Sequence, residues 1–417
     1  MALVGLALST VGYGQTQQSP YSSYGIGEIQ STAVTGQLSS GGIGIGGGHA
    51  FYNNTRNSAW LARNQFTIFD IGAQGESRAI RTDSSVTNIG SGGLRSLALV
   101  FPIVQKTKFR WTSSVGMLPY STVSYRLTTE RPLDGEIEEA TYVFEGSGGY
   151  NQVYWSNGLM LSKNFYVGLK ASYLFGSISR ESVVTMQPQG VVASQNIAIL
   201  EQSSLSDFNW EASLGYEAAL TETLRLRAGA VYGAAANLNT QVLNRIDVRN
   251  SYNVATNIDT INYGAGTQFF PHYLGVGLAF EKRNNWVIGL DAEYQPWSQY
   301  RDTQGELDPN LTDLLRLVLG SQITPGWNST RYLQRVGYGL GFSYENTPIS
   351  INGRQINDFG INFGLSLPVS RFNSSLNMSV QVGTRGTIEA DLIRENYVKL
   401  NLGVSYNQLW FVRSKYD

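Results

Sequence analysis

The chain has 417 residues, of which 30 are Lys or Arg and 31 are Asp or Glu, so its net charge is close to zero. Only 15% of its residues are charged, against about 25% in typical soluble domains, whereas 12% are aromatic and 46 residues are glycine. The charge balance excludes the broad electrostatic attraction of nucleic-acid binding, the absence of cysteine excludes disulfides, and no apolar run reaches the roughly 18–20 residues of a membrane-spanning helix.

The first residues are similar to part of a secretory signal. Residues 1–14 (MALVGLALSTVGYG) form a short apolar stretch that ends in small residues and is followed by Gln15-Thr16-Gln17-Gln18. Such a stretch is too short to span a bilayer, and the basic start of a signal is missing, because the first Lys or Arg is Arg56. We interpret residues 1–14 as the remnant of a signal peptide and expect an exported protein.

Residues 15–65 show no regular hydrophobic period and contain the glycine-rich run Gly41–Gly48. No Lys-Ser or Lys-Thr pair follows this run, so it is not a phosphate-binding loop. Irregular backbone is tolerated at membrane depth when it is buried inside a barrel. The segment is therefore predicted to be an N-terminal hatch in a barrel lumen, with six hatch or gate candidates: Phe51, Tyr52, Asn57, Ser58, Ala59 and Trp60.

From residue 66 onward, many segments alternate with a period of two. Between Phe208 and Ala218, apolar residues occupy one face and Asn, Glu, Ser and Gly occupy the other, as in a strand with one apolar side. The alternation persists for about ten residues, which is the length of a tilted bilayer-spanning strand, whereas strands of soluble proteins average about five or six. The pattern predicts an all-β fold, with a transmembrane β-barrel over residues 66–417.

Fourteen such segments can be placed, and an even number of antiparallel strands returns both chain ends to the periplasm. The segment 312–323 is rich in leucine and is equally compatible with a short helix. The predicted strands are 66–80, 92–104, 109–124, 150–162, 165–179, 206–219, 223–235, 271–281, 285–298, 312–323, 331–345, 357–368, 374–384 and 396–406.

The links between these strands alternate in length. Short links occur at 163–164, 221–222 and 282–284, and longer ones at 125–149, 180–205, 236–270, 299–311 and 385–395. Outer-membrane barrels have short periplasmic turns and longer extracellular loops. The short links are therefore predicted to lie at the periplasmic rim and the longer ones outside the cell.

The alternation also assigns the two faces of the barrel wall. Leu169, Leu214, Leu226 and Leu402 are predicted to contact lipid. Charged residues on the opposite face are predicted to line the lumen, and the carboxylates at 291 and 293 are expected to pair with Arg225, Arg227 or Arg335 rather than to bind a cation. The lumen-facing candidates are Glu211, Arg225, Arg227, Asp291, Glu293 and Arg335.

Three stretches of the chain resemble those of a known family. The first, Gly42–Asp70, contains Asn57-Ser58-Ala59 where that family has Asn-Pro-Ala, and the second, Tyr273–Tyr300, is a Gly-rich hairpin that ends in a Trp-Ser pair. The third comprises Ile356–Val369 and the Trp-Phe-containing tail Asn396–Asp417. These stretches are similar to the hatch, a hairpin and the closing strands of the FadL-type outer-membrane transporter family, which has relatives in type IX secretion such as PorV. The resemblance implies a fourteen-stranded barrel with a hatch.

Chemical catalysis is not expected. The chain has two histidines, His49 and His272, in contexts typical of loop or interfacial residues, and neither a Ser–His arrangement nor a metal-ligand pattern is evident. No catalytic residue, cofactor or metal site is therefore predicted.

We therefore expect a channel of the bacterial outer membrane for hydrophobic, fatty-acid-like small molecules, which is the function that the resemblance implies. The alternative is a non-transporting barrel subunit or gate of an outer-membrane secretion or assembly complex, similar to PorV of type IX secretion. The expected partners are outer-membrane lipid and lipopolysaccharide, with a hydrophobic ligand in the first case and the machinery in the second; nucleic acid is not expected. An apolar pocket between hatch and wall would favour transport, whereas a filled lumen and an exposed apolar loop patch would favour the subunit.

Overall fold

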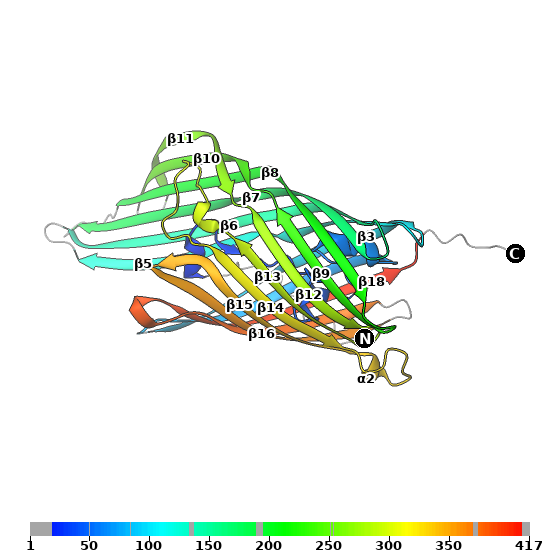
Figure 1. The fold of residues 1–417 in the computed structure, drawn as a ribbon. Coiled ribbons are helices and arrows are strands. Elements are labelled where there is room, and N and C mark those ends of the chain that lie inside the picture. The colour runs from blue at the N-terminus through cyan, green and yellow to red at the C-terminus, as the bar shows by residue number, and fades with distance from the viewer. Residues whose placement is uncertain are drawn as a thin grey trace, which may run out of the picture.

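The computed structural model describes residues 19–410, except for residues 50, 84, 133–136, 189–194, 251, 253 and 370–373. The predicted signal remnant at 1–14 lies outside the described residues. Fourteen antiparallel strands close into a barrel, which confirms the fold class (Figure 1). Closure occurs where β18 pairs with β2, in a register that runs from Gln408 opposite Thr67 to Arg394 opposite Arg81.

Each predicted strand corresponds to one strand of the wall, and the leucine-rich segment 312–323 is a strand. The fourteen wall strands are β2 (Thr67–Arg81), β3 (Val86–Gln105), β4 (Arg110–Pro119), β6 (Ile137–Met160), β7 (Phe165–Pro188), β8 (Gln195–Ala219), β9 (Leu224–Gly233), β12 (Tyr273–Lys282), β13 (Trp286–Gln295), β14 (Leu314–Ile323), β15 (Gly337–Ile351), β16 (Arg354–Pro368), β17 (Ser375–Gly386) and β18 (Arg394–Gln408).

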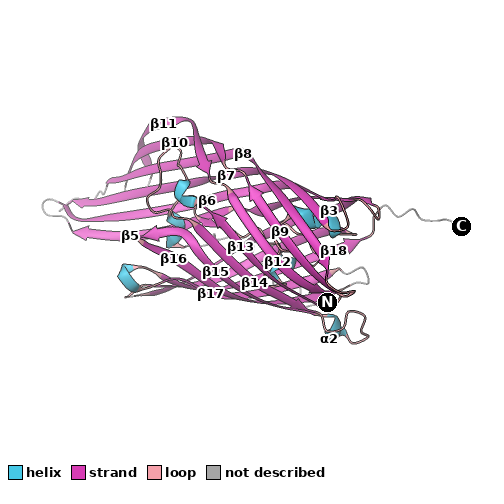
Figure 2. Ribbon diagram, in the orientation of Figure 1, coloured by secondary structure: helices cyan, strands magenta, loops and turns pink. Residues whose placement is uncertain are grey.

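Three of the longer links prove to be largely strand rather than loop. The chain leaves the wall after β4 and after β9 to form β5 (Ser121–Pro132), β10 (Ala236–Arg249) and β11 (Ala255–Phe270). In the wall itself, β4 pairs directly with β6 and β9 pairs with β12. The three strands join the long outer halves of β6, β7 and β8 in a sheet that extends beyond the barrel (Figure 2). We call this sheet the outer extension.

Short helical turns replace two predicted strand ends. Trp297 and Ser298 belong to η3 (Trp297–Gln299), which follows β13, and residues 332–335 form α2 (Tyr332–Arg335) before β15 begins. A further turn, η4 (Glu389–Asp391), connects β17 to β18. No helix among the described residues is long and apolar enough to cross a membrane.

The outer face of the wall is apolar and the inner face is polar, as the alternation predicts. Leu214 is 60% exposed and its neighbour Ser213 only 5%, while Leu402 is exposed and Asn401 is buried. Exposed Leu, Val, Ile and Phe side chains recur along most of the wall strands. A surface of this kind is stable only against lipid, and the protein is an outer-membrane barrel.

The depth of Leu214 in the membrane gives a first testable prediction. Leu214→Arg should destabilise the barrel by about 2–4 kcal/mol, because the guanidinium would face lipid near the middle of the bilayer. Leu220→Arg, at the turn after β8, should cost roughly 0–1 kcal/mol, since an interfacial arginine reaches water. Urea unfolding in lipid vesicles measures both. Equal stability of the two variants would show that the register of β8 against the membrane is wrong.

The N-terminal segment lies inside the barrel. It contains η1 (Pro20–Ser23), β1 (Glu28–Ile29), α1 (Thr35–Leu38) and η2 (Ser58–Arg63), and most of residues 19–64 are buried. In Figure 1 this blue segment is seen between the strands of the wall. We call residues 19–65 the plug.

The orientation of the barrel in the cell can be tested because the chain has no cysteine. We expect Tyr263→Cys, in the outer extension, to react in intact cells with a maleimide too large to cross the outer membrane. Glu222→Cys, in the short turn between β8 and β9, should react only after the membrane is permeabilised, because short turns face the periplasm. The reverse pattern would contradict the predicted topology.

Candidate functional site

The plug backbone lies directly on a strip of glycines in the wall. A methyl group at Gly229 would lie 1.8 Å from the carbonyl oxygen of Ile45, and one at Gly339 would lie 1.9 Å from that of Ser39. Atoms cannot approach so closely, so only glycine admits the plug at these positions. The same plug stretch contacts several further wall glycines, namely Gly277, Gly320, Gly341 and Gly364.

A buried carboxylate of the wall fixes the glycine-rich run of the plug. Asp291 accepts hydrogen bonds from the backbone N–H groups of Gly44 at 2.7 Å, Ile45 at 2.9 Å and Gly46 at 2.9 Å. Three consecutive N–H groups turned toward one carboxylate form an anion-binding concavity. The glycine-rich run therefore binds the side-chain carboxylate of Asp291 in the same chain.

Arg56 of the plug completes this contact. Its guanidinium lies 3.4 Å from the Asp291 carboxylate, forms an ion pair with Glu293 and donates to the carbonyl of Gly42. Glu293 also accepts from the Tyr273 hydroxyl at 3.0 Å. Arg56 and Asp291 are almost completely buried. A buried charge is tolerated only when it is paired and hydrogen-bonded, so this cluster depends on the plug being in place.

A second cluster surrounds Glu28 near the other end of the plug. The Glu28 carboxylate lies 3.1 Å from Arg78 of β2, 2.8 Å from Arg385 of β17 and 3.6 Å from Lys399 of β18. Further wall carboxylates share these cations, since Arg78 also pairs with Glu395 and Arg385 also pairs with Asp358. Glu28 therefore joins the plug to strands from both sides of the closure.

The third plug charge is also paired. Arg63 lies 3.4 Å from Glu217 of β8 and 3.3 Å from Glu281 of β12. The fully buried Arg227 pairs with both of these carboxylates. Residues 15–65 contain only three charged side chains, Glu28, Arg56 and Arg63, and each of them is engaged by the opposite charge on the wall.

The Asn57-Ser58-Ala59 turn is fixed without the proline of the resembled family. The Asn57 side chain accepts from the Ala59 N–H at 3.0 Å and donates to the Ile45 carbonyl at 2.9 Å and to the Leu214 carbonyl at 3.1 Å. Asn57 thereby caps η2, in which Ser58 is buried. Trp60 donates from its indole to Ile45 at 2.9 Å. The hatch candidates at this turn therefore hold the plug against β8.

The aromatic hatch candidates lie near the short-turn end. Phe51 stacks on Trp327 at 5.0 Å between ring centres, and His49 stacks on the same ring at 5.8 Å. Burial, followed by the nearby cations Arg63 and Arg227, lowers the pKa of His49 to about 4, so its ring is neutral at physiological pH. Tyr52 is buried and hydrogen-bonds Ser366 of the wall.

The structure places the lumen-facing candidates of the wall strands on the inner face and places Arg335 outside the wall strands. Glu211 lies 2.7 Å from Lys170, and Arg225 pairs with Glu217, so both point inward with Arg227, Asp291 and Glu293. Arg335 is instead exposed on α2, beside the ring of Tyr332. The expected cations for Asp291 and Glu293 were also wrong, because the plug residue Arg56 occupies that position and Arg316 lies 3.7 Å from Glu293.

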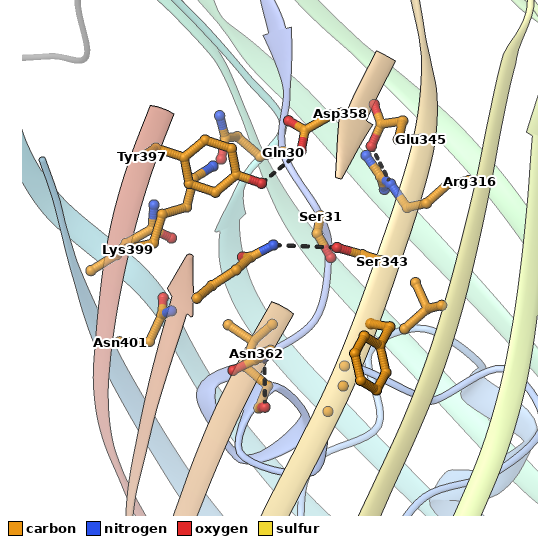
Figure 3. Close-up of a pocket in the computed structure, with 18 of the residues that line it drawn as sticks. Gln30, Ser31, Arg316, Ser343, Glu345, Asp358, Asn362, Tyr397, Lys399 and Asn401 are labelled. Carbon is orange, nitrogen blue, oxygen red and sulfur yellow. Dashed lines mark hydrogen bonds and ion pairs between the residues drawn. The ribbon is translucent and has the colours of Figure 1, made fainter. Parts of the chain in front are cut away.

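Small cavities remain between the plug and the wall and at the outer end. One between plug and wall holds about 110 Å³, and Figure 3 shows the polar side chains that point into it, with Asp358 bonded to Tyr397 and Arg316 bonded to Glu345. Another, of about 370 Å³, lies at the outer end and is lined by charged and amide side chains such as Arg180 and Gln268. Both of these cavities are lined largely by charged and amide side chains, whereas pockets for hydrophobic ligands are lined mainly by apolar groups.

Comparison with known proteins gives one family and several similar folds. A family model described as BamG matches residues 1–417, while no curated protein matches the chain. A Pseudomonas aeruginosa FadL homologue is 12% identical with a TM-score of 0.56, over 91% of this chain and 99% of its own. The Pseudomonas putida toluene transporter TodX is 13% identical with a TM-score of 0.53, over 86% of this chain and 94% of its own. The CymD monoaromatic hydrocarbon channel is 13% identical with a TM-score of 0.53, over 92% of this chain and 99% of its own. At these identities the likeness concerns the fold.

Proposed function

The chain belongs to the BamG family, and from this premise we propose that it acts as a closed, non-transporting barrel subunit of an outer-membrane assembly or secretion complex. In this role the barrel is a membrane anchor. The outer extension and the two rims would then offer contact surfaces for other components.

The observation that carries this proposal is the locked plug. All three plug charges are paired with charged residues of the wall. The plug backbone at Ile45 and Ser39 lies so close to Gly229 and Gly339 that no residue larger than glycine fits at these two wall positions. Release of the plug would leave Asp291 and Glu293 of the wall without their main cation. The pairs of all three plug charges and the close backbone contacts would have to break together, so a resting equilibrium with an open lumen would be sparsely populated.

The outer extension supports the same function. Its exposed residues include apolar and aromatic side chains, among them Ile258, Ile261 and Tyr263, at 55%, 62% and 72% exposure. Exposed apolar groups clustered on one element commonly mark a protein contact.

Passage of hydrophobic compounds is the second candidate, and the similar folds favour it. TodX is a toluene transporter and CymD a monoaromatic hydrocarbon channel by their descriptions. For this chain the function would require the plug to shift when ligand binds, because the lumen is otherwise filled.

Two measurements on the intact protein separate these functions. We expect the purified barrel to show almost no ionic conductance in planar bilayers, and vesicles containing it to take up no more of a fluorescent fatty acid than protein-free vesicles. Mild detergent extraction from the native membrane should release it in a particle much larger than the 45.8 kDa chain.

A deletion of residues 41–60 provides the control for the conductance assay, because it removes Arg56 and should open the lumen. Uptake by the intact barrel that is lost in the deletion would establish transport instead. Migration of the native protein as a lone barrel would contradict the role in a complex.

A further inference from the structure

Strand β11 forms one edge of the outer extension. It pairs with β10 from Ala255 to Phe270, with two register shifts, and β10 pairs in turn with β8. The next strand, β12, is already occupied on both edges, by β9 and β13. On its other side, β11 makes a single bridge at its base, between Phe269 and Arg301. Among the described residues, no strand covers the edge from residue 255 to residue 263.

This free edge lies far from the membrane. Phe270 is opposite Ala236, where β10 leaves the wall, and residues 255–263 follow the strand away from that point. They are 7 to 15 positions farther along, which corresponds to roughly 20–50 Å at about 3.3 Å per residue. In Figure 1, β10 and β11 stand out from the barrel beside β8. Lipid therefore does not cover the apolar side chains on this edge.

The edge also lacks most of the features that keep natural edge strands from pairing. Residues 255–263 (ATNIDTINY) contain one charged residue, Asp259, and neither lysine nor proline. Two register shifts interrupt this stretch, and they leave Thr256 and Ile261 without an opposite residue in β10. Long, uncharged edges with exposed Ile and Tyr are templates for another strand.

We propose that a β-strand of a different protein adds to the free edge of β11, an inference that rests on the proposed role in a complex. The free backbone N–H and C=O groups of residues 255–263 would supply its main hydrogen bonds. Exposed Ile258 and Tyr263 would pair with β-branched or aromatic residues of the incoming strand, and Asp259 would favour a lysine or arginine opposite it.

A second copy of this chain does not fit the edge. Two barrels in one membrane are related by a two-fold axis along the membrane normal. Antiparallel self-pairing of β11 needs a two-fold axis perpendicular to the strand, and parallel self-pairing needs one along it. Because β11 continues the direction of β8 through β10, and barrel strands tilt by about 35–45°, neither axis coincides with the normal. A strand of a separate protein has no such restriction.

The test places a photo-crosslinking amino acid at Ile258 or at Tyr263 of the full chain, in cells that express it at its native level. Addition of a strand predicts that both positions cross-link to one polypeptide, at sites about five residues apart, as their own spacing requires. A probe at Leu214, on the lipid face of β8, is the matched control and should not yield this product. Cross-links to a second copy, to scattered sites or to no protein would overturn the proposal.

Two proline variants test whether the backbone carries the contact. Neighbouring residues of a strand direct their N–H groups to opposite sides, so of Asn257→Pro and Ile258→Pro only one removes an N–H that faces away from β10. That variant should lose the cross-link from Tyr263 while the barrel keeps its urea stability. If both variants keep the cross-link, the edge is not the contact. A native particle that keeps its size in both variants would overturn this inference and leave the proposed function standing, whereas a wild-type chain that runs alone would remove the proposed function.

Discussion

Arg56→Met is expected to open the barrel and to destabilise it by about 3–5 kcal/mol, because it leaves buried carboxylates without their main cation. Asp291 would keep its three backbone hydrogen bonds, but these lie on the plug, which Arg56 helps to hold. Glu293 would keep only the Tyr273 hydroxyl and the more distant Arg316. The unfavourable burial of these carboxylates is reduced most easily if water enters beside them. Water can enter only if the plug moves away from β12 and β13.

Ionic conductance in planar bilayers and urea unfolding in vesicles measure the two effects. Arg126→Met is the matched control, because Arg126 pairs with Glu145 at 3.9 Å and both side chains are more than half exposed. Exposed pairs contribute about 0–1 kcal/mol, so this variant should behave as the wild type does. An Arg56→Met barrel with unchanged conductance and stability would show that the plug is held by other contacts.

The sequence predicts the wall well because each wall strand has an inside and an outside. Lipid on one face and the polar plug on the other impose a period of two, as Leu214 beside Ser213 illustrates. The pattern is local, so it can be read without knowledge of which strands pair. The number of strands and the direction of most side chains follow from it.

The strands of the outer extension could not be predicted from hydrophobic periodicity, for a physical reason. Residues 255–263 of β11 are exposed on both faces, so no hydrophobic period distinguishes this strand from a loop. Similarly, the segment before β15 contains Tyr332 and Leu333, which extend the apolar pattern, yet both are exposed on or beside a short helix at the rim. Because of these two apolar residues, the predicted strand begins at residue 331, whereas β15 begins at Gly337, and Arg335 was wrongly assigned to the strand.

The plug contacts could be predicted only in part. Few charges occur in residues 15–65, and isolated charges in a segment bound for a lumen indicate that each has a partner. Which partner it has depends on contacts between distant residues: Arg56 lies 237 positions from Glu293, and Arg385 lies 357 positions from Glu28. No local pattern encodes such a separation, so the sequence identified Asp291 and Glu293 as luminal and missed the cation between them.

Gly229→Val is the second variant for which we expect a large effect, and it tests fit rather than charge. The Cβ at this position would meet the Ile45 carbonyl at 1.8 Å and the Asn57 side-chain nitrogen at 2.7 Å. The same carbonyl accepts the hydrogen bonds of Asn57 and Trp60. The plug must therefore retreat from β9, and these two bonds are lost together. Overpacking alone costs about 1–3 kcal/mol, and loss of the two buried hydrogen bonds adds to that cost.

Gly93→Val is the matched control, because Gly93 also lies in a wall strand and a methyl group there meets no atom within 4 Å. The Gly229 variant should show several-fold higher conductance and a lower urea midpoint, whereas the Gly93 variant should match the wild type. A Gly229 barrel that stays closed would mean that the plug can shift along the wall without leaving the lumen. In that case the charge pairs of Glu28, Arg56 and Arg63, rather than the glycine strip, would set its position, and combining Gly229→Val with Arg56→Met should then open a barrel that the glycine change leaves closed.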